Sequence, residues 1–177
     1  MSAGENHATH HSTHGSGHTI FMYNVEDAEG VMFPMSDLYG KKAYLIVNVA
    51  SECGFTATNY KELKILHDKF APLGLEIIAF PCNDFGGQEP GDNDQIQQFA
   101  KEWGAEFKVM GKLECKGRHE ANPIYHMLTE TMHLEDITWN FMKFITDRYG
   151  RPVVAVKHDV SPLELEEDIM RVLEEEP

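Results

Sequence analysis

One cysteine in the stretch SECGFT, residues 51–56, has the surroundings of a nucleophile. Cys53 follows the apolar run YLIVNVA, residues 44–50, and precedes a segment with helical spacing. At the start of a helix, unpaired backbone N–H groups and the helix dipole favour the thiolate form of a cysteine. Because the thiolate is the nucleophilic form, Cys53 is a candidate for attack on an electrophile. The alternative is a buried and inert side chain, which is common among free cysteines.

Thr56 stands where a CxxC motif would have its second cysteine. A dithiol oxidoreductase passes its disulfide between two such cysteines, and here the second position has a hydroxyl. A lone thiolate suits a peroxide instead: the sulfur attacks one oxygen, water or an alcohol leaves, and a sulfenic acid awaits another thiol. This chemistry needs hydrogen-bond donors, and we expect no metal and no cofactor. The stretches that offer such donors are FPCNDFGGQEPG, residues 80–91, and TWNFMKF, residues 138–144.

A β-α-β unit is predicted to position Cys53. The runs YLIVNVA and LEIIAFP, residues 44–50 and 75–81, are nearly continuous and rich in β-branched residues, as is typical of strands buried on both faces. Between them, apolar residues recur at steps of three or four, which indicates a helix with one apolar face. These residues are Tyr60, Leu63, Leu66 and Phe70.

The rest of the chain continues the alternation of helices and strands. We expect a helix after the cap-rich GDND at 91–94, and another that starts at Asn122-Pro123, an asparagine cap followed by proline. Strands are expected at 141–147 and 152–156, and a capping box at 161–164 opens a last helix. A β-α-β start and a β-β-α finish predict an α/β protein with a thioredoxin-like fold, in which helices flank a central mixed sheet.

Composition narrows the classes of protein and partner. A chain of 177 residues suits one domain, and a net charge of −14 disfavours nucleic acid as a partner. No stretch approaches the roughly 20 apolar residues that span a bilayer, so we expect no stable membrane insertion. The spacing of Cys53, Cys82 and Cys115 matches neither a zinc site nor a disulfide scaffold, which favours a reducing compartment. The N-terminus has no secretory signal pattern, so we expect a cytoplasmic protein.

Residues 1–19 differ in character from the rest of the chain. They are small and polar, and we predict a disordered His-rich tail followed by one domain at 20–177. Weak capture of a transition metal by clustered imidazoles is the functional alternative. The histidines of this tail are His7, His10, His11, His14 and His18.

Three blocks together resemble the glutathione peroxidase family, in its cysteine-containing form without selenium. NVASECGFT, FPCNDFGGQEPG and WNFMKF occur in the family's order, and the resemblance runs from about Ile20 to near the C-terminus. It implies a thiol-dependent peroxidase that reduces hydrogen peroxide and organic or lipid hydroperoxides and protects against oxidative stress. The resemblance assigns the peroxidatic cysteine to Cys53 and the hydrogen-bond donors of the site to Gln88, Trp139 and Asn140.

The chain departs from the family in two places. Asp84 replaces the usual glutamine of the middle block, and we expect it to face solvent, because a carboxylate near the thiolate would disfavour it. Lys101 stands where thioredoxin-dependent members carry a resolving cysteine. The remaining candidates for a resolving cysteine are Cys115, which we expect in an exposed connection, and Cys82.

Without a resolving cysteine, the second half-reaction requires a thiol from outside. We expect glutathione or a thioredoxin-like protein to reduce the sulfenate as co-substrate. The short segment from Leu128 to Trp139 resembles members that lack a tetramer-supporting loop, which implies a monomer.

Other hypotheses are a thioredoxin-like redox sensor or partner-docking module that signals through Cys53 oxidation, and metal delivery by the His-rich tail. Cations that could steer an anionic tripeptide are Lys101, Lys112, Lys116 and Arg118.

Overall fold

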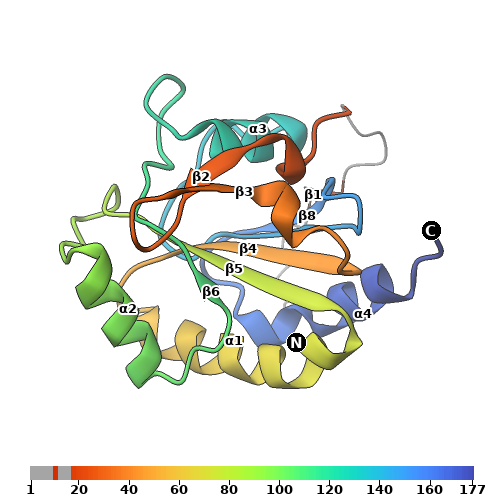
Figure 1. Cartoon of the computed structure of the whole chain (residues 1–177), viewed down its shortest axis with the longest axis horizontal. Coiled ribbons are helices and arrows are strands. Elements are labelled where there is room, and N and C mark those ends of the chain that lie inside the picture. The colour runs from red at the N-terminus through yellow and green to blue at the C-terminus, as the bar shows by residue number, and fades with distance from the viewer. Residues whose placement is uncertain (1–9, 12–16) are drawn as a thin grey trace, which may run out of the picture.

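A six-stranded mixed sheet forms the centre of the protein. The computed structural model describes residues 10–11 and 17–177, and the strand order is β1-β8-β7-β4-β5-β6 (Figure 1). The strands of this sheet are β1 (His10–His11), β4 (Ala43–Val49), β5 (Leu75–Pro81), β6 (Lys108–Val109), β7 (Lys143–Thr146) and β8 (Pro152–Val156). A separate hairpin consists of β2 (Asn24–Glu26) and β3 (Met32–Pro34).

Helices cover both faces of the sheet. The α-helices are α1 (Thr56–Phe70), α2 (Asn93–Glu102), α3 (Pro123–Thr131) and α4 (Glu166–Glu174). Short 3-10 helices span Ile20–Met22, Met35–Leu38, Ala71–Leu73 and Pro162–Leu165. In the part of the chain that the structure describes, no helix has both the length and the apolar character needed to cross a membrane.

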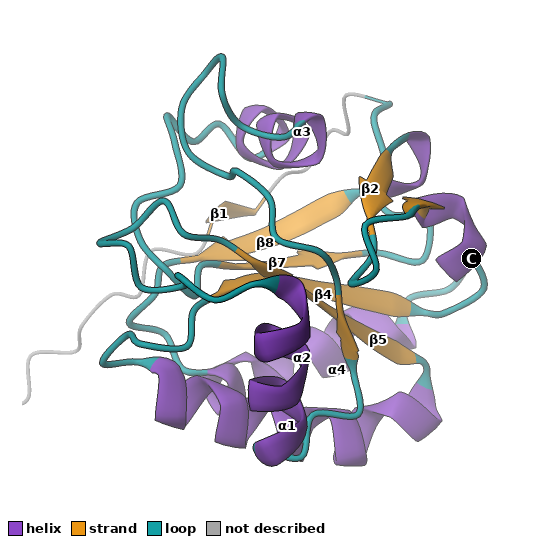
Figure 2. Cartoon of the chain, turned by 60° about the vertical axis from the view of Figure 1, so that its left-hand side comes forward, coloured by secondary structure: helices purple, strands orange, loops and turns teal. Residues whose placement is uncertain are grey.

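Strand β4 lies at the centre of the sheet and divides the core into two layers. It runs parallel to β5 and antiparallel to β7, and all its residues are buried. Successive side chains of a strand point to opposite faces. Leu45 and Val47 pack with α1 and α4, whereas Tyr44 and Ile46 pack with α3. Figures 1 and 2 show α1, α2 and α4 on one side of the sheet, here called the α1 face, and α3 on the other, the α3 face.

The structure confirms the predicted thioredoxin-like α/β architecture and differs from the prediction in details. Strand β7 begins at Lys143 and not at 141, because Phe141 has a φ of 64°, which is incompatible with an extended strand. The capping box of Ser161 and Glu164 forms, but it opens the 3-10 turn Pro162–Leu165 that precedes α4. The β2–β3 hairpin and the two-residue strand β6 were not expected from the sequence.

The predicted N-terminal tail falls mostly outside the described residues. Residues 1–9 and 12–16 are not described, so the tail as a whole stays a prediction. Within its range, the backbone of His10 and His11 pairs antiparallel with Ala155 and Val154 of β8. The domain predicted from residue 20 onward contains the sheet strands from β4 to β8 and all four α-helices.

Candidate active site

Cys53 lies in the turn between β4 and α1, held by the hydroxyl of Thr56. The backbone N–H of Cys53 donates to Thr56 Oγ1 at 3.1 Å, and this hydroxyl donates to the carbonyl of Ala50 at 2.8 Å. The side chain of Cys53 is 8 % exposed, and Gly54 beside it is exposed. Thr56 therefore fixes the turn that presents the thiol at the rim of the core, at the position where CxxC would supply a second sulfur.

The loop with Trp139 and Asn140 is fastened to the end of β4 by Asn48. The buried side-chain amide of Asn48 donates to the carbonyl of Trp139 at 3.0 Å, and the backbone carbonyl of Asn48 accepts from the N–H of Phe141 at 2.6 Å. These two bonds place residues 138–141 at the strand end that leads into Cys53.

Gln88, Trp139 and Asn140 meet around Gly86. The side-chain amide of Asn140, which is fully buried, donates to Gln88 Oε1 at 2.8 Å. A Cβ atom at Gly86 would lie 3.3 Å from both the Trp139 ring and the Gln88 side chain, and its φ of 68° also favours glycine. Phe85 packs against Trp139, with 5.9 Å between ring centroids. The structure thus brings the three predicted donor residues together in one cluster.

The backbone of Gln88 connects this cluster to the cysteine turn. Its carbonyl accepts from the N–H groups of Ser51 and Glu52, at 3.2 and 3.0 Å. These two residues directly precede Cys53. The three sequence blocks therefore converge at the carboxyl end of β4, although their catalytic roles remain predictions.

Glu89 is a buried acid that was not among the residues predicted from the sequence. The amide and hydroxyl of Ser51 donate to Glu89 Oε1, and the N–H of Glu89 donates to Asn83 Oδ1 at 3.0 Å. Burial raises the pKa of Glu89 to about 7, while the bonds from Ser51 oppose this shift. Its second oxygen, Oε2, has no hydrogen-bond partner among the described residues. Its position directly after Gln88 in the QEPG stretch was the sequence signal that could have indicated its place near the site.

Cys82 and Cys115 contact each other on the α3 face. Their sulfur atoms are 2.8 Å apart, and both side chains are buried, whereas Cys53 packs on the α1 face. The exposed position expected for Cys115 was wrong, because its loop runs along the end of β5, where the N–H of Leu113 donates to the carbonyl of Pro81 at 3.0 Å. The two candidate resolving cysteines are thus paired with each other.

Asp84 does not face solvent as expected from the sequence. It is half-buried, and its Oδ2 accepts from the N–H groups of Cys115 and Lys116, at 2.8 and 3.2 Å, and from Cys82 Sγ at 3.2 Å. The short carboxylate is held there because two otherwise unpaired backbone N–H groups point at it. The charge that replaces the family's glutamine therefore contacts the pair of Cys82 and Cys115.

The cations predicted to steer a tripeptide belong to separate segments. Lys101 is exposed on α2, on the α1 face, and Lys112 is half-buried. Lys116 and Arg118 are exposed in the loop before α3, near Cys115. Steering by all four as one group is therefore not supported by their placement.

The fold and this site define a class: a thioredoxin-like protein with one cysteine at the mouth of the first long helix and neutral donors gathered beside it. A comparison with known families matches residues 20–129 to the family described as glutathione peroxidase. The chain belongs to the glutathione peroxidase family.

Individual relatives agree with this assignment. The chain is 46% identical over 160 residues to a probable phospholipid hydroperoxide glutathione peroxidase of Citrus sinensis, covering 88% of this chain and 95% of the relative. It is 43% identical to probable glutathione peroxidase 3, mitochondrial, of Arabidopsis thaliana, with 89% and 78% covered. The crystal structure of T. cruzi GPX1 superposes with a TM-score of 0.71 at 30% identity, over 88% of this chain and 97% of that one.

These relationships settle the kind of enzyme. The protein is an oxidoreductase, a peroxidase that reduces hydroperoxides at the expense of thiols. They favour this activity over the redox sensor or docking module that the sequence also allowed.

Proposed function

We propose that Cys53 is the peroxidatic nucleophile and that Gln88, Trp139 and Asn140 assist it. The observation that carries this proposal is the convergence of the cysteine turn and the donor cluster at the carboxyl end of β4. The Cys53 thiolate attacks one oxygen of the hydroperoxide, the O–O bond breaks, and the alcohol or water leaves with a proton. Cys53 is left as a sulfenic acid.

Asn140 orients Gln88 for this reaction. Because Gln88 Oε1 accepts from Asn140, the other end of the Gln88 side chain, its NH₂ group, remains free to donate. Neutral N–H donors from Gln88 and Trp139 favour a thiolate and the charge that develops on the departing oxygen. They do so without a competing nucleophile in the cluster.

An external thiol completes the cycle in this proposal. It displaces water from the sulfenic acid to give a mixed disulfide, and a second thiol then releases Cys53 as a thiol together with an external disulfide. The mutual contact of Cys82 and Cys115 on the α3 face supports this route over an internal resolving cysteine. Glutathione or a thioredoxin-like protein is the reductant.

Organic and lipid hydroperoxides are proposed substrates beside hydrogen peroxide. Phe55, 38 % exposed and two residues from Cys53, offers apolar surface at the thiol. The name of the Citrus sinensis relative, a phospholipid hydroperoxide glutathione peroxidase, points the same way. We further propose that the protein is cytoplasmic. We also propose that it is a monomer, since only seven residues separate the end of α3 at Thr131 from Trp139, too few for a long loop that supports a tetramer.

Turnover with two reductants tests the proposal. Hydrogen peroxide and a lipid hydroperoxide are each supplied with glutathione or with a thioredoxin system, and turnover by the parent is compared with that of Cys53→Ser. We expect turnover by the parent with at least one reductant and none by the serine variant. Equal turnover by the two proteins would refute the role of Cys53, and the ratio between reductants identifies the co-substrate.

A further inference from the structure

The pair of Cys82 and Cys115 is a second group of reactive atoms, separate from the Cys53 site. Cys82 follows β5 directly, and Cys115 belongs to the loop between β6 and α3. Their side chains are 0 % and 1 % exposed. They lie on the α3 face, across the sheet from the layer in which Cys53 packs. The peroxidase mechanism proposed above uses neither sulfur.

The distance between the two sulfur atoms favours a bond between them over a shared metal ion. At 2.8 Å they are closer than the roughly 3.5–4.0 Å at which even smaller non-bonded carbon atoms rest. Two thiolates on one tetrahedral zinc ion, each at about 2.3 Å, would be about 3.8 Å apart. A disulfide bond is about 2.05 Å long, so its formation requires only a small further approach.

Hydrogen bonds hold both ends of the pair in place. The N–H of Cys82 donates to the carbonyl of Val49 at 3.1 Å, which ties it to β4. Asp84 accepts from the N–H of Cys115 at 2.8 Å and contacts Cys82 Sγ at 3.2 Å. Since the backbone on each side is already fixed, closing the bond costs little additional conformational entropy.

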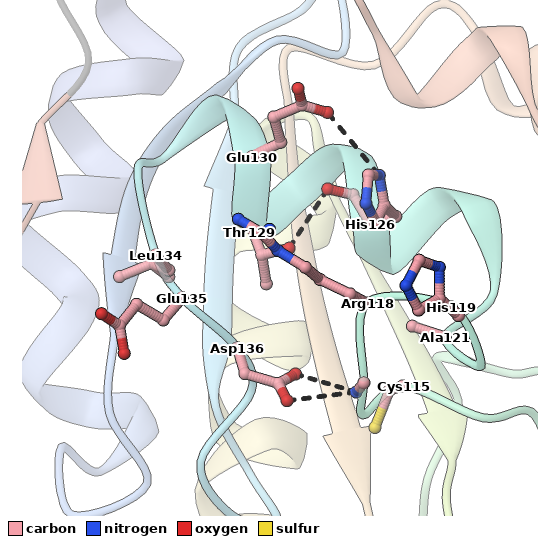
Figure 3. Close-up of a pocket in the computed structure, with 11 residues that line it drawn as sticks. Cys115, Arg118, His119, Ala121, His126, Thr129, Glu130, Leu134, Glu135 and Asp136 are labelled. Carbon is pink, nitrogen blue, oxygen red and sulfur yellow. Dashed lines mark hydrogen bonds and ion pairs between the residues drawn. The ribbon is translucent and has the colours of Figure 1, made fainter.

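A cavity lies next to the pair, on the side of Cys115. Cys115 lines a hollow of about 570 Å³ between α3 and the loops before and after it. Figure 3 shows Cys115 at the edge of the residues that line this cavity, with its sulfur pointing away from Arg118 and His126. Because Cys115 is only 1 % exposed, a hydroperoxide that enters this cavity reaches the sulfur when the loop before α3 moves.

We propose that Cys82 and Cys115 form a second redox site, which hydroperoxide oxidises to an intramolecular disulfide. The Cys115 sulfur takes one oxygen of the peroxide, the O–O bond breaks, and the thiol proton leaves with the alcohol, or with water when the oxidant is hydrogen peroxide. Cys82 then attacks the resulting sulfenic acid, the S–O bond breaks, and the hydroxyl departs with the Cys82 proton as water. The two thiols have lost two hydrogen atoms, and one hydroperoxide has been reduced.

The second site reacts with peroxide more slowly than Cys53 does, because its surroundings oppose ionisation of its thiols. Burial, the contact with Cys82 and the charge of Asp84 all raise the pKa of Cys115. Because the protonated thiol is a poor nucleophile, the pair is oxidised slowly and needs an excess of peroxide. The disulfide therefore forms under sustained exposure, when it ties the segment that leads to Gln88 to the loop before α3.

Oxidation of the Cys53→Ser variant tests the second site without the first. The full chain is treated with excess hydrogen peroxide, denatured, alkylated without reduction and digested with trypsin. We expect the intact mass to fall by two hydrogen atoms and both thiols to resist alkylation. A disulfide should link the peptide of residues 70–101 to that of residues 113–116, and reduction should separate them.

Matched variants keep the result specific. Cys53→Ser combined with Cys115→Ser should retain one alkylatable thiol, at Cys82, and should lose no hydrogen atoms. The proposal is overturned if both thiols of Cys53→Ser remain alkylatable, if oxygen atoms are added instead, or if the linkage joins two chains. Zinc bound in a one-to-one ratio and protecting both thiols would also overturn it, in favour of a metal site with Asp84. Since Cys53 is absent throughout, none of these results bears on its peroxidatic role.

Discussion

The two thiol sites lie on opposite faces of one sheet and have opposite surroundings. At the α1 face, the Cys53 turn is held by a neutral hydroxyl, and the nearby cluster is built from amides and an indole. At the α3 face, Cys82 and Cys115 are buried against each other, with the carboxylate of Asp84 in contact. Burial and negative charge disfavour a thiolate, whereas neutral N–H donors favour it.

A single loop after β5 serves both sites. Cys82 belongs to the cysteine pair and Asp84 contacts it, while Gln88, a few residues on, belongs to the donor cluster beside Cys53. Gly86, with a positive φ, lies between them and lets the chain reverse within this short distance. The difference in chemistry between the two sites thus arises from the directions in which the side chains of this loop point. Removing the thiol of each site in turn tests whether the two sites act independently.

The largest expected effect comes from removing one sulfur from each site in turn. Cys53→Ser should lower kcat/KM for hydroperoxide by at least about a thousandfold, because the attacking atom is lost. Cys115→Ser should leave turnover with an external thiol close to that of the parent. Steady-state kinetics with glutathione and with a thioredoxin system measure both. An equally large loss in Cys115→Ser would make Cys115 the resolving cysteine and merge the two sites.

The next effect concerns the donor cluster at Cys53. Gln88→Ala should lower kcat/KM for peroxide by about a hundredfold, the loss expected when one preorganised donor is removed. Gln88 is half-buried, so the fold should tolerate the change. Asn140→Ala acts through the same bond, at 2.8 Å, and the double variant should lose little more than Gln88→Ala alone. Fully additive losses would show that Asn140 does not position Gln88.

The architecture followed from local patterns in the sequence. The central strands appear as continuous β-branched runs, and β5 has the predicted bounds of Leu75–Pro81. Asn122 caps α3, which begins at the predicted Pro123. These features depend on neighbours along the chain. The short strand β6 has no such signal, because two residues carry too little periodicity to distinguish a strand from a loop.

The contents of the two thiol sites could be predicted only in part. The family resemblance predicted that Gln88, Trp139 and Asn140 share one site, and the structure places them in one cluster. The pairing of Cys82 with Cys115 joins residues 33 positions apart in the sequence, through a loop without regular structure. No local pattern encodes such a contact, and for the same reason the direction of Asp84 was predicted wrongly.

A smaller effect, on stability, tests how the Cys53 turn is held. Thr56→Val keeps the shape of the side chain but removes its bonds to Ala50 and Cys53, leaving a buried carbonyl and N–H unpaired. We expect a loss of about 2 kcal/mol in the free energy of unfolding, together with slower attack on peroxide. Thr58→Val on the exposed side of α1 is the matched control. Denaturant unfolding and peroxide kinetics should separate the two variants; similar curves would deny Thr56 this role.

The smallest expected effect is a pH dependence of stability that belongs to the Cys53 side alone. The pKa of Glu89 is raised by burial from 4.5 to about 7, so between these values the folded protein holds a proton that the unfolded chain has lost. Stability therefore falls as pH rises through this interval. Glu89→Gln, which can still accept from Ser51, should flatten this fall by about 1 to 2 kcal/mol. Urea unfolding at both ends of the interval measures the slope, and Glu52→Gln, at an exposed neighbour, is the control.

An unchanged slope in Glu89→Gln would mean that Glu89 is already ionised in the folded protein. A negative charge would then lie beside the turn of Cys53, and much of the contrast with the site at Asp84 would disappear.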